Sequence, residues 1–222
     1  MTATFTAQPG YFITFEGIDG CGKTTIVRFV EQHLRQCQIP VLVTREPGGT
    51  TIGNEIRQIL LKVSDRVVNP KTELLLYAAD RAQHVHERIL PVLREGRVVL
   101  CDRYTDATRA YQGVGRGFDP AWIEALMEFA TGGLKPDLTI LLDLEVAQAQ
   151  QRLRESNERG VRSGHDRLDA ETLEFHERVR QAYLELARRE PDRVRVISAA
   201  GTAEETCRAA LEVVEALLKR KT

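Results

Sequence analysis

The sequence predicts an α/β protein in which a five-stranded parallel sheet is flanked by helices on both faces. Five short apolar runs alternate with segments of helical periodicity, and right-handed crossovers turn such an alternation into a parallel sheet. The runs are almost continuously apolar, as expected of strands that are covered on both sides. Residues 1–222 are expected to form one domain, since the chain contains no linker, repeat or low-complexity tract.

The expected elements alternate regularly along the chain. The apolar runs predict strands at 11–15, 41–43, 98–101, 138–142 and 194–197. Apolar spacings of three and four residues predict helices from the end of a glycine-rich loop to Leu34, and at 52–63, 70–94, 120–130, 169–188 and 203–218. Trp122 is expected in the core, and the closely spaced glycines of 105–117 predict a mobile segment.

Composition and charge exclude several classes of protein. The chain is 42% hydrophobic with a net charge of −1, so a polyanion-binding surface and a nucleic-acid partner are not expected. No run approaches the roughly eighteen apolar residues of a membrane helix, and the chain start lacks a signal-peptide pattern. A cytoplasmic protein without a membrane partner is therefore expected.

The four cysteines have no paired spacing, which argues against a zinc site or a disulfide framework. Cys37, Cys101 and Cys207 are expected to be structural. Cys21 lies in the glycine-rich loop next to a predicted helix N-terminus, where partial positive charge is expected to lower the thiol pKa. The simpler alternative is that Cys21 is a small residue in a permissive position.

The glycine-rich loop matches the pattern G-x-x-x-x-G-K-[ST] of a phosphate-binding loop. Its glycines allow successive backbone N–H groups to turn towards phosphate oxygens, while a lysine adds a mobile charge and a hydroxyl can bind Mg²⁺. The helix that follows favours an anion at its N-terminus. The loop predicts a triphosphate site formed by Gly17, Gly20, Gly22, Lys23, Thr24 and Thr25.

Further candidates lie where predicted strands end. Arg45 and Arg103 each follow a strand, at the edge of an open α/β sheet where ligands bind, and Asp102 occupies the position of a carboxylate that holds Mg²⁺ directly or through water. Surface ion pairs are the alternative for all three.

Two further segments offer polar or aromatic side chains to a ligand. Tyr77 and Arg81 are four residues apart and share a helix face. The amide of Gln112 could read a base edge through both its donor and its acceptor. A core tyrosine, a surface arginine and a solvated glutamine remain the alternatives.

An arginine-rich segment at about 152–167 predicts a lid that closes over the triphosphate. Its arginines would stabilise the transferring phosphoryl group and exclude water, although such a run can also be a solvated loop. The arginines concerned are Arg152, Arg154, Arg159, Arg162 and Arg167.

The ordered motifs FEGIDGCGKT, TREPGGT, YAADRAQH, CDRY, AYQG and HDRL resemble those of bacterial thymidylate kinases. The resemblance extends from about Tyr11 to Leu217. It implies a P-loop nucleoside monophosphate kinase fold and transfer of the γ-phosphate of ATP to thymidine monophosphate with Mg²⁺, for dTTP synthesis. It also implies a homodimer and a cis peptide before Pro47.

The resemblance implies a role for each matched residue. Lys23 and Thr24 would bind ATP phosphates and Mg²⁺, and Asp102 would position a magnesium-bound water. On the acceptor side, the implied roles are Asp19 near the sugar and phosphate, Arg45 and Arg103 on the phosphate, Tyr77 stacked on thymine, Arg81 donating to O4, and Thr108 with Gln112 at the remaining base-edge and sugar positions. Since Gly20 stands where relatives of another type carry a basic residue, the catalytic arginine would come from the lid, with Arg159 assigned to it.

Two departures from the family pattern leave alternatives open. Ala107 stands where many relatives have serine, which leaves Thr108 as the hydroxyl at this position and could relax base selection. The segment 156–165 is longer than usual, so Arg154 and Arg162 compete with Arg159 for the catalytic role. The competing functions are a kinase for dUMP or GMP and a P-loop nucleotide-dependent switch protein.

Overall fold

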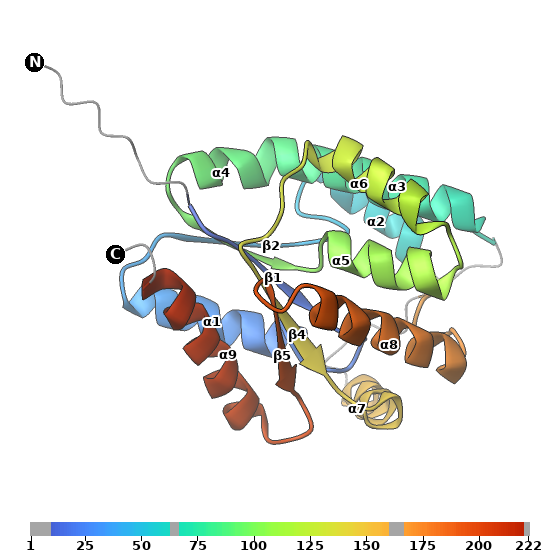
Figure 1. The fold of residues 1–222 in the computed structure, drawn as a ribbon. Helices are drawn as coiled ribbons and strands as arrows, with labels where there is room; N and C mark the ends of the chain where they lie inside the picture. Colours follow the sequence, from blue (N-terminus) through green and yellow to red (C-terminus); the bar gives the residue numbers. More distant parts are fainter. Residues whose placement is uncertain (1–9, 63–66, 160–166, 220–222) are drawn as a thin grey trace, which may run out of the picture.

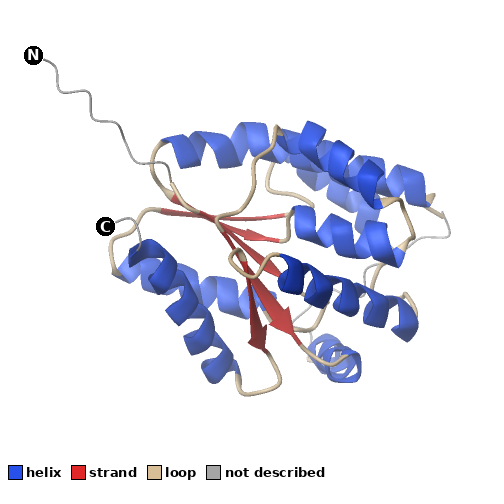
Figure 2. Ribbon diagram, viewed as in Figure 1, coloured by secondary structure: helices blue, strands red, loops and turns tan. Residues whose placement is uncertain are grey.

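The five predicted strands form one parallel sheet in the order β2-β3-β1-β4-β5. The computed structural model describes residues 10–62, 67–159 and 167–219. The strands are β1 (Phe12–Glu16), β2 (Val41–Arg45), β3 (Val98–Asp102), β4 (Leu138–Asp143) and β5 (Val194–Ser198). The predicted fold class is confirmed, and Figure 2 shows the twisted sheet with helices on both sides.

Alternating side chains of β1 bind the two helical layers to the sheet. Ile13 and Phe15 belong to a core shared with α1 (Lys23–Gln36) and α9 (Ala203–Leu218), which lie side by side (Figure 1). Phe12 instead packs against Val85 and Ile89. Because successive strand residues face opposite ways, a single central strand holds both layers.

The helix predicted at 70–94 is continuous, but its middle part is π-helical rather than α-helical. It comprises α3 (Pro70–His84), a π-helical segment η1 (Val85–Ile89) and α4 (Leu90–Arg94). Both α2 (Thr51–Leu61) and α6 (Pro120–Thr131) contact α3, while α7 (Val146–Glu158) contacts α8 (Leu173–Arg189). Within the described residues, no helix combines the length and apolar character needed to span a membrane.

Capping side chains explain where several helices begin. The Thr50 hydroxyl accepts from the N–H of Gly53, and Asn69 caps α3 ahead of Pro70. Thr202 and Glu205 form a reciprocal capping box at α9. These side chains satisfy N–H groups that have no partner inside the helix.

Two local predictions are wrong. Trp122 is 74% exposed, because α6 buries the face of Ile123, Met127 and Ala130 and leaves the tryptophan on the opposite side. The segment 105–117 is mostly helical, comprising α5 (Thr105–Thr108) and the π-helical η2 (Arg109–Gly115). One of its glycines, Gly115, allows close packing, since a Cβ there would lie 2.8 Å from the Phe175 ring.

A buried carboxylate holds α5 against the sheet. Asp106 is 1% exposed and accepts hydrogen bonds of 2.7 Å from both Arg193 and Arg109, and one of 3.1 Å from Thr139 of β4. Burial alone would raise the pKa of Asp106, but Arg193 and Arg109 hold it below its ordinary value. The same short helix carries Ala107 and Thr108, so this cluster positions part of the central cavity.

We expect Asp106→Asn to lower the free energy of unfolding by about 3 kcal/mol or more, because it removes the buried negative charge that Arg109 and Arg193 share. Urea titration followed by circular dichroism would measure the loss. Glu124→Gln removes the exposed partner of Arg109 and should cost less than about 1 kcal/mol. Equal losses in the two variants would contradict the assigned role of Asp106.

Candidate active site

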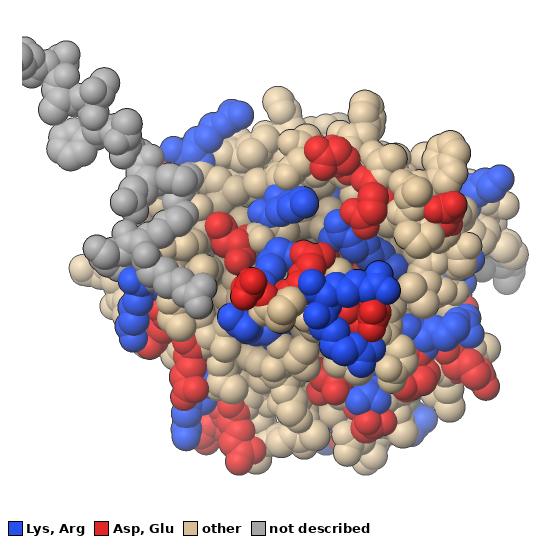
Figure 3. Space-filling model, viewed as in Figure 1, with Lys and Arg blue, Asp and Glu red and all other residues tan. Residues whose placement is uncertain are grey.

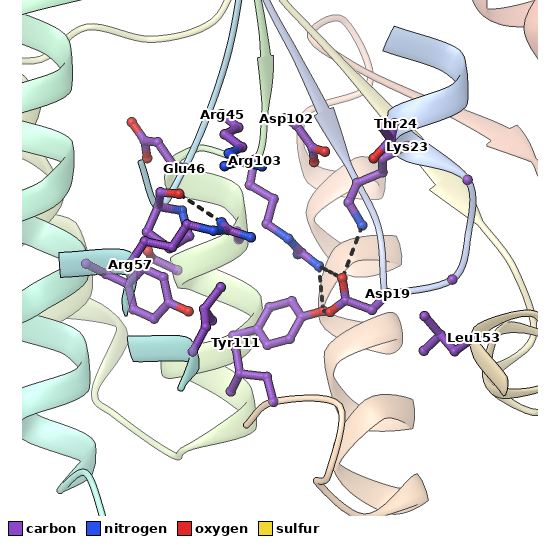
Figure 4. A pocket seen from close by; sticks show the side chains of 18 of the residues that line it. Asp19, Lys23, Thr24, Arg45, Glu46, Arg57, Asp102, Arg103, Tyr111 and Leu153 are labelled. Atoms are coloured by element: carbon purple, nitrogen blue, oxygen red, sulfur yellow. Dashed lines mark hydrogen bonds and ion pairs between the residues drawn. The ribbon is translucent and has the colours of Figure 1, made fainter. Parts of the chain in front are cut away.

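A cavity of about 400 Å³ lies at the carboxyl ends of β1, β2 and β3, where the sequence-predicted residues converge (Figure 4). Among its lining residues are Asp19, Gly20, Gly22, Lys23, Thr24, Thr25, Arg45, Tyr77, Arg81, Asp102, Arg103, Thr108 and Gln112. Of the predicted site residues, Gly17 and Arg159 are not part of this lining. Open α/β sheets bind ligands at this edge.

The phosphate-binding loop has the backbone that its glycines predict. Gly17, Gly20 and Gly22 have φ of +134°, +84° and +100°, and a Cβ on Gly20 would lie 2.3 Å from the Ala149 carbonyl oxygen. Residues with a Cβ resist such conformations. The loop leads directly into the first turn of α1, so its N–H groups and the helix N-terminus face the cavity end that suits an anion.

Lys23 extends back across the loop that precedes it. Its ammonium donates to the carbonyls of Gly17 and Ile18 at 3.0 and 3.1 Å and lies 3.8 Å from Asp19. The side chain is 7% exposed yet lines the cavity. One positive charge is thus held at the mouth of a loop whose backbone donors can bind an anion.

Arg103 is held in a left-handed backbone conformation, with φ of +72°, which is unusual for a residue with a long side chain. Its N–H donates to the Phe15 carbonyl at 3.0 Å, and the following N–H, of Tyr104, donates to Glu16 at 2.7 Å. These bonds tie the strained residue to the carboxyl end of β1, where it lines the cavity together with the phosphate loop.

The guanidinium of Arg103 is fixed from two sides. It donates to Asp19 at 2.8 Å and to the Tyr111 hydroxyl at 3.1 Å, and it lies 4.8 Å from the centre of the Tyr111 ring (Figure 4). It also donates to Tyr183 of α8 at 3.3 Å. A cationic group is therefore prepositioned beside the phosphate loop, where an acceptor anion would bind.

A second arginine, Arg81, is buried beside the loop that follows β2. The Arg81 Nε donates to Glu46 at 2.7 Å, and its other nitrogens donate to Thr108 Oγ1, the Tyr104 carbonyl and the Met127 sulfur. His84 bridges Glu46 and Thr44 at 2.9 and 2.6 Å. The peptide between Glu46 and Pro47 is cis, as the resemblance implies.

Asp102 offers an unsatisfied oxygen to this cavity. Its Oδ1 is buried and has no hydrogen-bond partner among the described residues, although Asp102 ends β3 and lines the cavity with Thr24. A buried carboxylate oxygen without a partner is costly unless a ligand or cation binds it. A carboxylate and a hydroxyl on one cavity wall are oxygen donors of the kind that Mg²⁺ prefers, so the residues present fit this ion.

Only part of the predicted lid falls within the described residues. Residues 152–158 continue α7 as helix, and Arg162 with the rest of 160–166 lies outside the described ranges. Arg152 lines the cavity and donates to the Ala199 carbonyl at 2.9 Å. Arg159 is 71% exposed and pairs with Glu155.

The expectation for Cys21 is wrong in direction. The thiol is buried, and desolvation raises its pKa despite the nearby Lys23 ammonium at 3.9 Å. Proximity to a helix N-terminus is therefore outweighed by exclusion from water. Cys37 is exposed, whereas Cys101 and Cys207 are buried as expected of structural cysteines.

Sequence reasoning missed several residues that shape the cavity. Tyr111 lies in the AYQG motif beside the chosen Gln112, and Arg57 donates to the Pro47 carbonyl at 2.9 Å from α2. Glu46 lies inside the TREPGGT motif between two selected residues. Position inside a motif was the available signal for Tyr111 and Glu46, whereas Arg57 had none, because its helix approaches the loop only in three dimensions.

Glu16 is a buried carboxylate at the end of β1 whose charge depends on pH near neutrality. It accepts from Tyr183 and the Tyr104 N–H at 2.7 Å each. Burial, with a contribution from Asp106, raises the pKa of Glu16 to about 7. Desolvation together with Glu46 raises the pKa of Asp80 to about 7 as well.

The comparisons with known proteins agree on one family. A family model described as thymidylate kinase matches residues 15–209. The chain is 50% identical over 197 residues to a thymidylate kinase of Geotalea uraniireducens, covering 89% of this chain and 92% of the relative. It is 50% identical over 205 residues to one of Geobacter sulfurreducens, covering 92% and 96%. A crystal structure of thymidylate kinase from Ehrlichia chaffeensis superimposes with a TM-score of 0.72 and 30% identity, covering 93% of this chain and 99% of that one.

We expect Glu16→Gln to flatten the pH dependence of stability between pH 5 and 8. A carboxyl whose pKa rises from 4.5 to about 7 on folding stabilises the folded state at low pH, and this stabilisation is lost as pH rises to 7. The amide oxygen can still accept from the Tyr104 N–H, and the amide N–H₂ can donate to the Tyr183 oxygen in place of the bond that Glu16 accepts. Because the amide does not ionise, the variant should not lose the ~3 kcal/mol of stability that the wild type loses as pH rises. Asp80 should still contribute in the same window. Urea unfolding at both pH values measures the slope, and an unchanged slope would refute the assignment.

Proposed function

The chain belongs to the thymidylate kinase family, and we propose that the cavity at the carboxyl ends of β1, β2 and β3 performs its reaction. The protein is an ATP-dependent nucleoside monophosphate kinase that transfers the γ-phosphate of ATP to thymidine monophosphate, giving ADP and thymidine diphosphate for dTTP synthesis. The observation that supports this location is that one cavity is lined by the phosphate loop and by Arg45, Tyr77 and Arg103.

The donor side of the proposed site is the phosphate loop and the first turn of α1. The backbone N–H groups of this turn would bind the phosphates of ATP. The Lys23 ammonium, which donates to the carbonyls of Gly17 and Ile18, would move to oxygens of these phosphates. The proposed ATP-binding residues are Gly17, Gly20, Gly22, Lys23, Thr24 and Thr25. Gly17 would contribute through loop geometry, since it does not line the cavity itself.

Mg²⁺ is proposed to bind between the phosphates and the cavity wall. Thr24 would coordinate it through the hydroxyl, and Asp102 would hold one of its waters through the unpartnered Oδ1. When bound, the ion neutralises charge that builds on the transferring group. The proposal is supported by the oxygen donors of Thr24 and Asp102 and by the burial of the unpartnered Asp102 Oδ1.

The acceptor phosphate is proposed to bind between Arg45 and Arg103. Arg103 is already held by Asp19 and Tyr111, so little side-chain entropy is lost when a phosphate binds to it. Asp19 lies between Lys23 and Arg103 and would separate the two phosphate sites. Since phosphoryl transfer needs mainly alignment and charge stabilisation, cationic groups on both sides suffice without a protein nucleophile.

The acceptor base is proposed to lie against Tyr77 and Arg81. Hydrogen bonds to described residues use four of the five N–H groups of the Arg81 guanidinium, which leaves one, on Nη2, for thymine O4. Thr108 and Gln112 would complete the base-edge and sugar contacts. Ala107 lines the same wall, so the hydroxyl there comes from Thr108.

The catalytic arginine is proposed to come from the lid segment at about 152–167. Arg159 remains the proposed residue, and it would have to turn away from Glu155 to reach the transferring phosphate. Arg152 is the alternative because it already lines the cavity. Residues 1–222 are proposed to act as one P-loop kinase domain, and the cytoplasmic location stays a prediction.

A homodimer is proposed through the outer face of α2, α3 and α6. Helices α2 and α6 each pack on α3 (Figure 1), and each of the three helices carries large apolar side chains that are exposed. The exposed apolar residues of these helices are Ile52 and Ile59 of α2, Leu75 of α3, and Trp122 and Phe129 of α6. An apolar face of this kind favours burial against a second copy.

A coupled assay with ATP, Mg²⁺ and a panel of nucleoside monophosphates tests the function. We expect the highest kcat/KM with thymidine monophosphate. Cytosine and adenine would leave the Arg81 donor and the base-edge groups unpaired, whereas uracil presents the same edge as thymine and loses only the contacts of the methyl group, a difference of about tenfold or more. Equal turnover of dUMP or GMP would contradict the assignment. As a control, Lys23→Ala should reduce turnover about 100-fold or more with every acceptor, since it removes a donor-side charge that all acceptors share.

The proposed dimer face can be tested by placing charges on it. The double variant Trp122→Glu, Phe129→Glu should convert a particle of twice the 25.0 kDa chain mass into a monomer, because a buried charge opposes association. Sedimentation velocity at micromolar concentration measures the mass. Phe29→Glu, which changes an exposed apolar residue of α1, should leave the dimer intact. A wild-type monomer at these concentrations would overturn the proposal.

A further inference from the structure

Glu73 of α3 is a fully buried carboxylate with no role implied by the family motifs. Its Oε1 accepts from the Gln112 Nε2 at 2.8 Å, and its Oε2 accepts from Arg116 at 3.2 Å and from Arg167. The donors come from η2, from the turn after it and from the residue at the start of the last described range. This one carboxylate therefore collects groups from three separate parts of the chain, of which Gln112 lines the cavity.

The two arginines keep Glu73 ionised. Burial alone would raise the pKa of Glu73, but hydrogen bonds from Arg116, Gln112 and Arg167 bring it below its ordinary value. An ionised carboxylate can accept hydrogen bonds but cannot donate them. Any group that contacts Glu73 closely must therefore present an N–H or O–H to it.

This constraint fixes which end of the Gln112 amide faces the cavity. With the amide reversed, its oxygen would lie 2.8 Å from an anionic oxygen, so the N–H₂ group has to face Glu73. Gln112 lines the cavity, and its Oε1 receives no hydrogen bond from a described residue. The amide consequently offers an acceptor to a ligand, whereas the sequence alone allowed both a donor and an acceptor.

We infer that Glu73 is a positioning residue for selection of the acceptor base, because it turns the Gln112 carbonyl towards the base edge. This inference rests on the proposed function of the cavity. Thymine presents a donor at N3–H and an acceptor at O4, which complement the Gln112 Oε1 and the Arg81 guanidinium. Cytosine presents an acceptor at N3 and a donor at its amino group. Its N3 would therefore face the Gln112 oxygen, acceptor against acceptor, and its amino group would face the Arg81 guanidinium, donor against donor.

A purely structural role makes a different prediction. If Glu73 merely fastens α3 to η2, its loss should weaken binding of every acceptor equally and lower stability. If it orients the amide, its loss should change the ratio between bases. The ratio of the affinities for two acceptor bases therefore distinguishes the two roles, even when the variant is less stable than the wild type.

The experiment compares dissociation constants for dTMP and for deoxycytidine monophosphate, measured by calorimetry, in the wild type and in Glu73→Gln. We expect the preference for dTMP to fall about tenfold or more, the scale of one misdirected hydrogen bond, while KM for ATP stays within about twofold. Glu171→Gln is the matched control, since Glu171 also pairs with Arg116, at 2.7 Å, but does not contact Gln112. Its preference should remain that of the wild type.

A double variant controls the comparison, and a measurement on the wild type keeps the inference testable if Glu73→Gln folds poorly. In a Gln112→Met background, Glu73→Gln should leave the base preference unchanged, because no amide remains to orient. In the wild type, the side-chain N–H₂ resonance missing from Gln112→Met should exchange slowly with solvent. Rapid exchange, or an unchanged preference in folded Glu73→Gln, would overturn the inference. A wild type that does not bind dTMP would instead refute the proposed function.

Discussion

The structure depends on pairing arginines with buried or half-buried carboxylates around a cavity that must remain cationic. A site for two phosphorylated nucleotides needs several guanidinium groups close together, and these repel one another. Asp19 holds Arg103, and Glu46 holds Arg81, at 2.8 and 2.7 Å. Because each pair fixes both the charge and the direction of an arginine, positive groups can surround the cavity while the chain as a whole carries a net charge of −1. Figure 3 shows charges of both signs interspersed on the face in view.

Burial alone does not decide the charge of these carboxylates. Glu73 and Asp106 each accept from two guanidinium groups, and their pKa values are lowered. Glu16 accepts from a tyrosine and a backbone N–H, and its pKa is raised to about 7. Direct guanidinium contact therefore determines the sign of the shift, since all three are almost completely removed from water. The carboxylates that orient other groups stay ionised across the neutral range, whereas Glu16 can take up a proton near pH 7.

The sequence predicted what depends on local chemistry. Apolar runs gave all five strands, and the loop from Gly17 to Thr24 was identifiable because its spacing reflects backbone conformation. The predictions that were wrong concern properties that depend on packing between distant parts of the chain. Trp122 is apolar but lies on the outer side of its helix, and Cys21 is excluded from water by its surroundings. Glu73 gave no signal, because its partners are 39, 43 and 94 residues away in the sequence.

The same pairing limits how the base pocket can discriminate. A glutamine amide that is free to rotate would accept either thymine or cytosine, because it carries a donor and an acceptor at nearly the same position. Selectivity then requires a group that removes one orientation, and a buried anion is well suited to this because it repels the amide oxygen. The arginines that keep Glu73 charged therefore act on base selection without contacting the base. In this fold, electrostatics that would otherwise serve only stability also determines which hydrogen-bonding pattern the cavity presents.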